Sequence, residues 1–325
     1  MSKHYLLLGA GFSRNWDGWL VSEIFDHLLT LEAMQQRPSL VALLKRHQRD
    51  GTGFEGALSA VQEAAARSSR TADDVMNLVV FQDAITSTFR LMNSMFFEKT
   101  GIDFSNSREA SVRDFLARFD AIFTLNQDLL LEKHYVDVVN PGNPGVGLPG
   151  IQRPLNLSPH DHARWLSEPW IVGDTVPGAA SWKNSQPVFK LHGSSNWRRS
   201  DGKDLVIMGG QKMKAIQESP VLTWYHDEFA RRLAEPGARL MTIGYGFQDQ
   251  HINAPIYQTK QLPIFIVDPL GTQIGLRPQD RRTDGVPVPN PMDSKNVVGI
   301  SKRSLSSTFG SDKLERTKVM GFFQP

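Results

Sequence analysis

The stretch Tyr5-Leu6-Leu7-Leu8-Gly9-Ala10-Gly11-Phe12-Ser13 decides the fold class of this chain. Residues 5–8 form a short continuous apolar run that ends at a glycine, which is typical of a buried central strand. The glycines and the serine that follow predict a turn from this strand into a helix. Small and polar residues at the carboxyl end of a buried strand lie where open α/β sheets bind their ligands. The stretch therefore predicts the first strand of a parallel sheet and one wall of a ligand site.

Three later motifs repeat this arrangement of an apolar run followed by small or polar residues. They are Thr124-Leu125-Asn126-Gln127-Asp128, Lys190-Leu191-His192-Gly193 and Gly244-Tyr245-Gly246-Phe247-Gln248-Asp249, and their apolar runs are residues 121–123, 188–191 and 240–243. A further strand over residues 264–267 ends at Asp268. The carboxyl ends of parallel strands meet at one edge of a sheet, so we expect the four motifs to share one pocket.

Between the first two motifs the sequence is helical in character. Residues 71–98 place apolar side chains at spacings of three and four, and Thr71 with the acidic residues after it predicts the helix start. Many prolines and glycines in residues 136–187 exclude a long regular element and predict a packed covering loop. We expect an α/β fold, a Rossmann-like parallel sheet with a helical insertion. The expected parts are residues 1–31 and 105–270 for the sheet domain, 32–104 for the insertion, and 271–325 for a tail that packs on the body.

Composition excludes several classes of protein. The 325 residues include no cysteine, which rules out disulfides, thiolate catalysis and cysteine-ligated zinc. The net charge of +2 argues against a nucleic-acid-binding surface spread over the whole protein. No window approaches the roughly 18 apolar residues of a membrane span, and the first apolar run is too short for a signal peptide. We expect a cytoplasmic protein that does not insert into a membrane.

The first two motifs each admit a binding role and a structural one. Glycines at 9 and 11 let a phosphate or a ribose approach the backbone, or simply make a tight turn. Asn126 offers a donor and an acceptor together, which suits a sugar hydroxyl or a water molecule, and its alternative is a role in a turn. Asp128 either accepts a hydrogen bond from a ligand amide or caps a helix that starts at residue 129.

The later motifs present the same choice. His192 follows a buried strand and titrates near neutrality, so it is the candidate general base, with a structural histidine as the alternative. Tyr245 and Phe247 either wall a ligand ring or plug the core. Asp249 either contacts the ligand or caps the next helix, and Asp268 stands where acidic residues bind ribose hydroxyls. The histidines at 160 and 162 have too few companions for a metal site, and we expect no metal.

Taken together, the motifs resemble the sirtuin superfamily, and specifically the sirtuin-like proteins of bacterial antiphage defence. Sirtuins carry a GAGxS turn, a TxNxD segment and a histidine-glycine pair in this order, and the chain has them at 9–13, 124–128 and 192–193. The stretch 244–253 is similar to the version in the defence branch, and the resemblance covers about residues 5–270. Two features of protein deacylases are missing: residues 15–19 read Asn-Trp-Asp-Gly-Trp where deacylases have Pro-Asp-Phe-Arg, and the four-cysteine zinc module is absent.

The resemblance implies an NAD hydrolase that cleaves NAD, as its substrate, into nicotinamide and ADP-ribose. Asn126 and His192 would be catalytic, as positioning residue and general base. The NAD-binding residues would be Gly9, Ala10, Gly11, Phe12, Ser13, Thr124, Asp128, Gly244, Tyr245, Phe247, Asp249 and Asp268. Family habit implies a homo-oligomer, or a partner such as a DNA-translocating ATPase or an Argonaute-like protein. The alternatives are an NAD-dependent deacylase or ADP-ribosyltransferase, and a non-enzymatic sensor of NAD or ADP-ribose.

Overall fold

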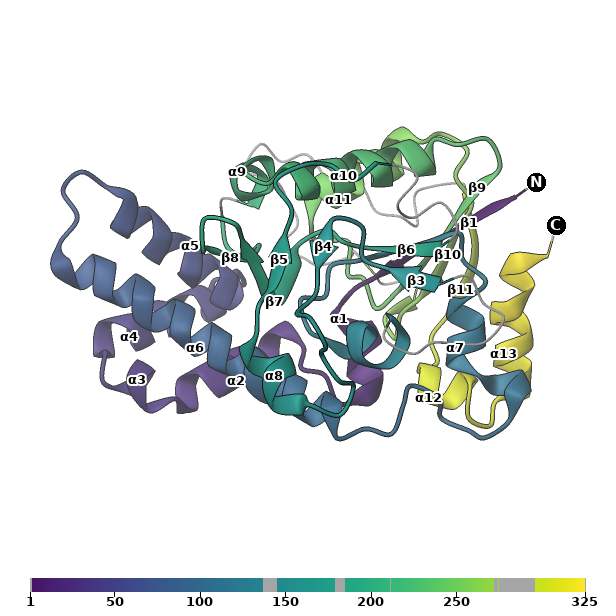
Figure 1. Ribbon diagram of the computed structural model, residues 1–325, viewed down its shortest axis with the longest axis horizontal. Coiled ribbons are helices and arrows are strands. Elements are labelled where there is room, and N and C mark those ends of the chain that lie inside the picture. Colours follow the sequence, from purple (N-terminus) through teal and green to yellow (C-terminus); the bar gives the residue numbers. More distant parts are fainter. Residues whose placement is uncertain are drawn as a thin grey trace.

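A seven-stranded parallel sheet runs through the centre of the molecule (Figure 1). The computed structural model describes residues 2–136, 145–178, 185–210, 212–271, 274 and 296–324. The strand order is β11-β10-β9-β1-β2-β6-β3, and every neighbouring pair is parallel. The strands are β1 Lys3–Leu8, β2 Ala121–Thr124, β3 Gly145–Gly147, β6 Ser185–Lys190, β9 Ala238–Ile243, β10 Ile264–Val267 and β11 Val297–Ser301. The expected α/β, Rossmann-like fold is confirmed.

The chain changes direction across the sheet between β1 and β9. From β1 it adds β2 and β6 on one side, and it then returns to add β9, β10 and β11 on the other. This is the topological switch point at which doubly wound sheets bind their ligands. The first and fourth sequence motifs, which begin at Gly9 and Gly244, follow the two strands that flank it.

Helices cover both faces of the sheet, which explains why its strands are continuous apolar runs. On one face α10 (Pro220–Leu233) packs Phe229 against Phe123 of β2, with ring centroids 4.8 Å apart. On the other face lie α7 (Val112–Leu116) and α13 (Lys313–Met320) (Figure 1). The C-terminal segment contributes Phe322, which is buried against His4 of β1 and Phe265 of β10.

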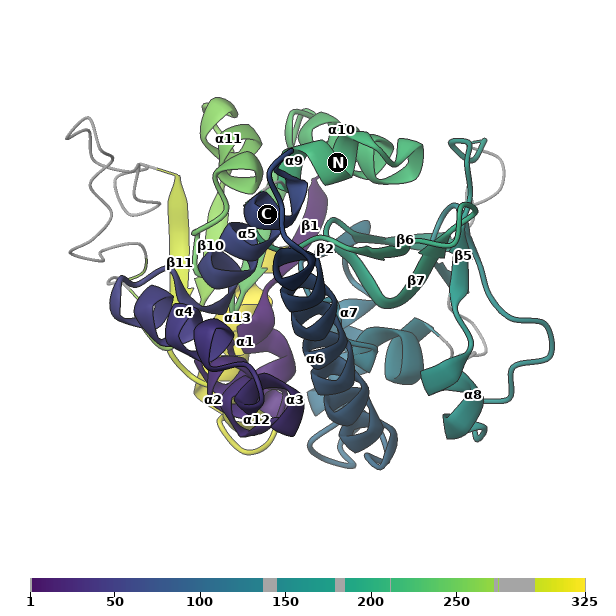
Figure 2. The same ribbon diagram turned by 90° about the vertical axis from the view of Figure 1, so that its left-hand side faces the viewer.

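The segment between β1 and β2 is helical, as its spacing predicts. Its helices are α1 Ala10–Ser13, α2 Val21–Thr30, α3 Glu32–Gln35, α4 Pro38–Arg49, α5 Gly53–Ala66, α6 Ala72–Phe97 and α7. Figure 2 shows α2 to α6 gathered beside the sheet, with α6 the longest of them. Thr71 is the N-cap of α6: its hydroxyl accepts from the Asp74 N–H at 3.1 Å, and the Asp74 carboxylate accepts from the Thr71 N–H at 2.8 Å. The domain boundaries given above remain predictions.

A second, four-stranded sheet was not expected from the sequence. Its order is β4-β5-β7-β8, from β4 Ile151–Gln152, β5 Trp170–Val172, β7 Gly193–Arg199 and β8 Asp204–Val206. Short helices α8 (His162–Ser167) and α9 (Lys212–Gln217) flank it. The C-terminal segment likewise supplies a strand, β11, and the helices α12 (Leu305–Thr308) and α13. Parts of the expected covering loop (137–144, 179–184) and tail (275–295) lie outside the described residues. Among the described helices, none is both long and apolar enough to cross a bilayer.

Three glycines let the loops after β1 and β9 touch through their backbones. A Cβ on Gly9 would lie 2.4 Å from the carbonyl oxygen of Gly244, and one on Gly244 would lie 2.3 Å from the backbone of Gly11. The Gly11 N–H donates to this Gly244 carbonyl at 3.1 Å. Gly244 also has a φ of +61°, which side-chain-bearing residues rarely adopt. Gly9, Gly11 and Gly244 are therefore required by the contact between the two motifs.

We expect Gly244→Ala to destabilise the protein by about 2–5 kcal/mol, because the added methyl group overpacks the contact and the left-handed conformation costs extra. Gly101→Ala is the matched control, since a Cβ there meets nothing within 4 Å. Urea unfolding of both variants measures the effect. If the two variants have the same free energy of unfolding, the contact between the loops after β1 and β9 does not stabilise the fold.

Candidate functional site

The register of the central strands brings the four motifs to one edge. Leu8 of β1 pairs with Thr124 of β2 and with Ile243 of β9, and Thr124 pairs with Lys190 of β6. Backbone hydrogen bonds continue past the strand ends, from Leu191 N–H to the Thr124 carbonyl at 2.9 Å and from Gly9 N–H to the Ile243 carbonyl at 3.0 Å. Neighbouring strands lie about 4.8 Å apart. Residues at the same distance beyond each strand end therefore emerge side by side.

The first and second motifs are joined by a chain of side-chain hydrogen bonds. The Asn126 amide donates to Ser13 Oγ at 2.9 Å, and Ser13 Oγ donates to Asp128 Oδ2 at 2.7 Å. Thr124 Oγ1 accepts from the Asn126 N–H at 3.1 Å. Within the described segments no hydrogen bond reaches the side-chain oxygen of Asn126, and this residue is only half-buried. The Asn126 oxygen is therefore available to a ligand.

Asp128 is almost fully buried, and its carboxylate accepts hydrogen bonds from the segment after β2 and from Ser13. Its Oδ1 accepts from the Leu130 N–H at 3.0 Å, while its Oδ2 accepts from Ser13. Burial raises the pKa of Asp128, and the nearby Lys190 ammonium and these hydrogen bonds oppose that rise. Asp128 thus holds Ser13 and, through it, the Asn126 amide.

A buried ion pair lies beneath this chain of hydrogen bonds. Lys190 Nζ donates to Glu132 Oε1 at 2.5 Å and to the Asp128 carbonyl at 2.5 Å, and Ser194 Oγ donates to Glu132 Oε1 at 3.2 Å. The side chains of Lys190 and Glu132 are 2% and 1% exposed. Burial raises the pKa of Glu132, although Lys190 opposes it. Lys190 therefore connects the end of β6 to the segment that carries Asn126.

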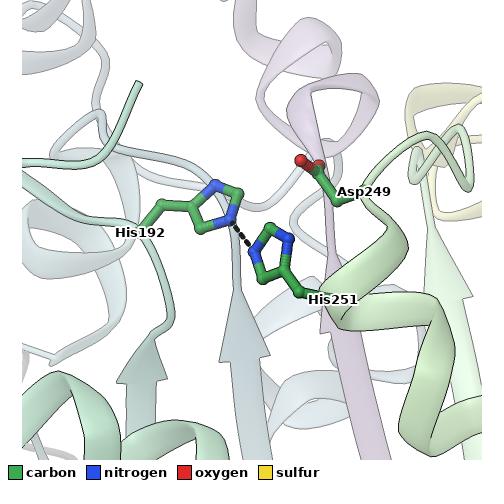
Figure 3. Close-up of side chains that lie close together, drawn as sticks. All are labelled: His192, Asp249 and His251. Atoms are coloured by element: carbon green, nitrogen blue, oxygen red, sulfur yellow. Dashed lines mark hydrogen bonds between the residues drawn. The ribbon is translucent and has the colours of Figure 1, made fainter. Parts of the chain in front are cut away.

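His192 faces a second histidine that the sequence analysis did not single out (Figure 3). Its Nε2 lies 2.9 Å from Nε2 of His251, and the two rings are stacked with centroids 5.1 Å apart. Burial lowers the pKa of His192 well below its usual value, and burial lowers the pKa of His251 to about 4. Both imidazoles are therefore neutral at pH 7, and one donates its N–H to the other.

Asp249 lies beside the two histidines and forms an ion pair with a lysine (Figure 3). It occupies the N-cap position of α11 (Gln250–Gln258), but its side chain makes no capping hydrogen bond, so the capping alternative is wrong for the carboxylate. Lys212 Nζ lies 2.8 Å from Asp249 Oδ1 and 2.8 Å from Glu55 of the helical insertion. The pKa of Asp249 lies below its usual value. Burial raises this pKa, but the opposing effects of His192 and Lys212 are together larger.

The other candidate residues lie around this edge with fewer polar contacts. Phe12 is 1% exposed and packs on Trp16. Tyr245 and Phe247 are each 3% exposed and their ring centroids are 4.7 Å apart, so in this structure they form the aromatic plug that was the alternative to a ring-binding wall. Asp268 directly follows β10, which lies three strands from β2, and its Oδ1 accepts from the Leu270 N–H.

The structure brings some predicted residues together directly and others only by strand register. Hydrogen bonds join Ser13 to both Asn126 and Asp128. Asn126 and His192 follow adjacent strands, but the Asn126 side chain bonds to Ser13 whereas the His192 side chain bonds to His251. The sequence patterns did not indicate a site role for His251, Lys212, Glu132 or Lys190. Lys190 stands at the end of an apolar strand, and this position predicts a buried carboxylate partner because a buried ammonium requires one.

A family model described as a SIR2-like domain matches residues 120–262. This match supports a sirtuin-like family for the chain. It includes Asn126, His192 and Asp249, whereas the Gly9–Ser13 turn lies outside it. SIR2-like domains are often NAD-dependent enzymes, so the match fits NAD-related activity in general. No curated protein matches the chain.

Lys190→Met should destabilise the protein by about 3–5 kcal/mol, because it leaves the Glu132 carboxylate buried without its cation. The double variant Lys190→Met/Glu132→Gln removes both charges and should recover part of this loss. Urea unfolding at pH 7 compares the two with the wild type. A single variant as stable as the wild type would mean that the ion pair does not stabilise the edge.

Proposed function

We propose that the protein hydrolyses NAD at the nicotinamide–ribose bond. One observation carries the proposal: Asn126 and His192 follow adjacent strands, each two residues beyond the paired Thr124 and Lys190, at the carboxyl edge of the sheet. A carboxamide and a neutral imidazole that emerge side by side suit a ribose and an attacking water. The SIR2-like match over the segment that contains both residues supports NAD as the substrate.

The reaction requires little beyond these two side chains and a water molecule. Cleavage of the bond between ribose C1′ and the nicotinamide nitrogen develops oxocarbenium character on the ribose. The electron pair of this bond passes to the pyridinium nitrogen, and nicotinamide leaves as a neutral molecule. A water oxygen then bonds to C1′ and gives up a proton to the base, which yields ADP-ribose.

His192 is the base, and its second nitrogen is the atom that accepts the proton. When His192 Nε2–H donates to His251, Nδ1 carries a lone pair, and within the described segments no hydrogen bond reaches this atom. The half-buried Asn126 presents its free side-chain oxygen to a ribose hydroxyl or to the water. Ser13 and the backbone of residues 9–13 line the diphosphate side.

The resemblance to defence proteins extends the proposal to a biological role. We infer an effector of antiphage defence that depletes cellular NAD on infection, acting as a homo-oligomer or with a partner protein. A DNA-translocating ATPase or an Argonaute-like protein is the expected kind of partner. This part of the proposal rests on the sequence resemblance alone.

Asn126→Ala and His192→Ala should each lower NAD consumption by about 10²–10⁴-fold, the usual effect of removing a general base or its positioning partner. Chromatography of nicotinamide and ADP-ribose after incubation with NAD, with and without candidate partners, measures this. His160→Gln, an exposed histidine, is the control and should keep the wild-type rate. Wild-type rates in both site variants would refute the assignment. Consumption that depends on an acyl-peptide or a protein acceptor would identify a transferase instead.

A further inference from the structure

Three side chains that bind metals well, one of them the proposed base, converge at this edge of the sheet (Figure 3). His192, Asp249 and His251 each offer one ligand atom, and these atoms all lie within 4.8 Å of one another. Two imidazole nitrogens and one carboxylate oxygen form a donor set found in three-ligand zinc sites, which keep a fourth position open. His192 comes from the end of β6, whereas the other two come from the start of α11, so the cluster bridges two separate elements.

The separations are close to those that a tetrahedral ion requires. Bonds of about 2.1 Å place neighbouring ligand atoms about 3.4 Å apart. The two Nε2 atoms are 2.9 Å apart, so a small separation of the rings accommodates the ion between them. The carboxylate oxygen lies within 4.8 Å of the two nitrogens and must approach by up to about 1.4 Å. Asp249 Oδ1 is bonded to Lys212, and within the described segments Oδ2 has no hydrogen bond and is free to turn toward the ion.

The Lys212 ammonium does not make the local charge unfavourable for a cation. Its charge is shared between Asp249 and Glu55, each 2.8 Å from Nζ, so the three side chains together carry one net negative charge. Both histidines contribute neutral nitrogens. A third histidine ring, that of His226, lies 5.6 Å from the ring of His251, but its Nε2 is bonded to the Leu191 carbonyl and stands outside the cluster.

We propose that His192, Asp249 and His251 form a site for a divalent transition-metal ion of the zinc class, and that metal binding there switches off the base. The ion takes the place of the hydrogen bond between the two Nε2 atoms. A neutral imidazole that coordinates through Nε2 holds its proton on Nδ1. His192 Nδ1 then has no lone pair with which to accept a proton from water. The inhibitory part rests on the proposed function, whereas the metal site stands on the geometry of the three side chains.

Calorimetric titration of the metal-stripped full chain with Zn²⁺ tests the site without any measurement of activity. The wild type should bind one equivalent, and Co²⁺ in its place should give the visible absorption of a tetrahedral site. His251→Gln and Asp249→Asn should each weaken binding by at least about 10-fold, since even outer partners of metal ligands contribute 10–100-fold. His160→Gln should bind as the wild type does, and circular dichroism checks that each variant folds.

The outcomes separate the two parts of the proposal. The metal site is overturned if the wild type shows no saturable Zn²⁺ binding. It is also overturned if the folded His251→Gln variant binds Zn²⁺ as tightly as the wild type does. If Zn²⁺ binds and NAD consumption falls as the site fills, both parts are supported. Unchanged NAD consumption at saturating Zn²⁺ overturns the inhibition. If the protein binds Zn²⁺ but consumes no NAD under any condition, the proposed function is overturned and the metal site is still supported.

Discussion

The contact between the backbones of Gly11 and Gly244 is the constraint on which the sheet edge depends. It lies at the switch point between β1 and β9, and a methyl group on either side would push the two loops apart. Because the loops meet there, the turn after β1 directs Ser13 toward β2, and the loop after β9 leads on to Asp249. Gly9, Gly11 and Gly244 thus fix the turn that carries Ser13 and the start of the loop that leads to Asp249.

Beneath that contact, buried charge keeps the second motif in place. Lys190 bonds to both the Asp128 carbonyl and the Glu132 carboxylate, so the end of β6 holds the start of the segment after β2. A buried ion pair is weak evidence for stability, because its desolvation offsets much of its attraction. Here the ion pair fixes a position. The Lys190 ammonium can bond to both the Asp128 carbonyl and the Glu132 carboxylate only when the ends of β2 and β6 lie as they do in this structure.

The sequence was sufficient for the strands whose ends carry the motifs, because continuous apolar runs bounded by glycine or polar residues have few other interpretations. It was insufficient for β7, whose residues Gly193-Ser-Ser-Asn-Trp-Arg-Arg199 lack any apolar alternation and pair with other short strands. It also missed the histidine pair. Phe247 adopts a φ of +55°, which is uncommon for a residue with a side chain, and this local bend precedes the helix start at which Asp249 and His251 lie. Such a bend depends on tertiary packing, and local sequence does not reveal it.

The helical insertion is linked by charge to the polar groups at the sheet edge. Lys212 divides its positive charge between Glu55 of α5 and Asp249, and Gly209 and Gly210 lie against Gln62 and Ser59 of the same helix. A displacement of α5 by a few ångströms would withdraw Glu55 and leave the whole ammonium charge to Asp249. The electric field across the paired imidazole rings would then change without movement of either ring. The electrostatic potential at the histidines therefore depends on the position of α5.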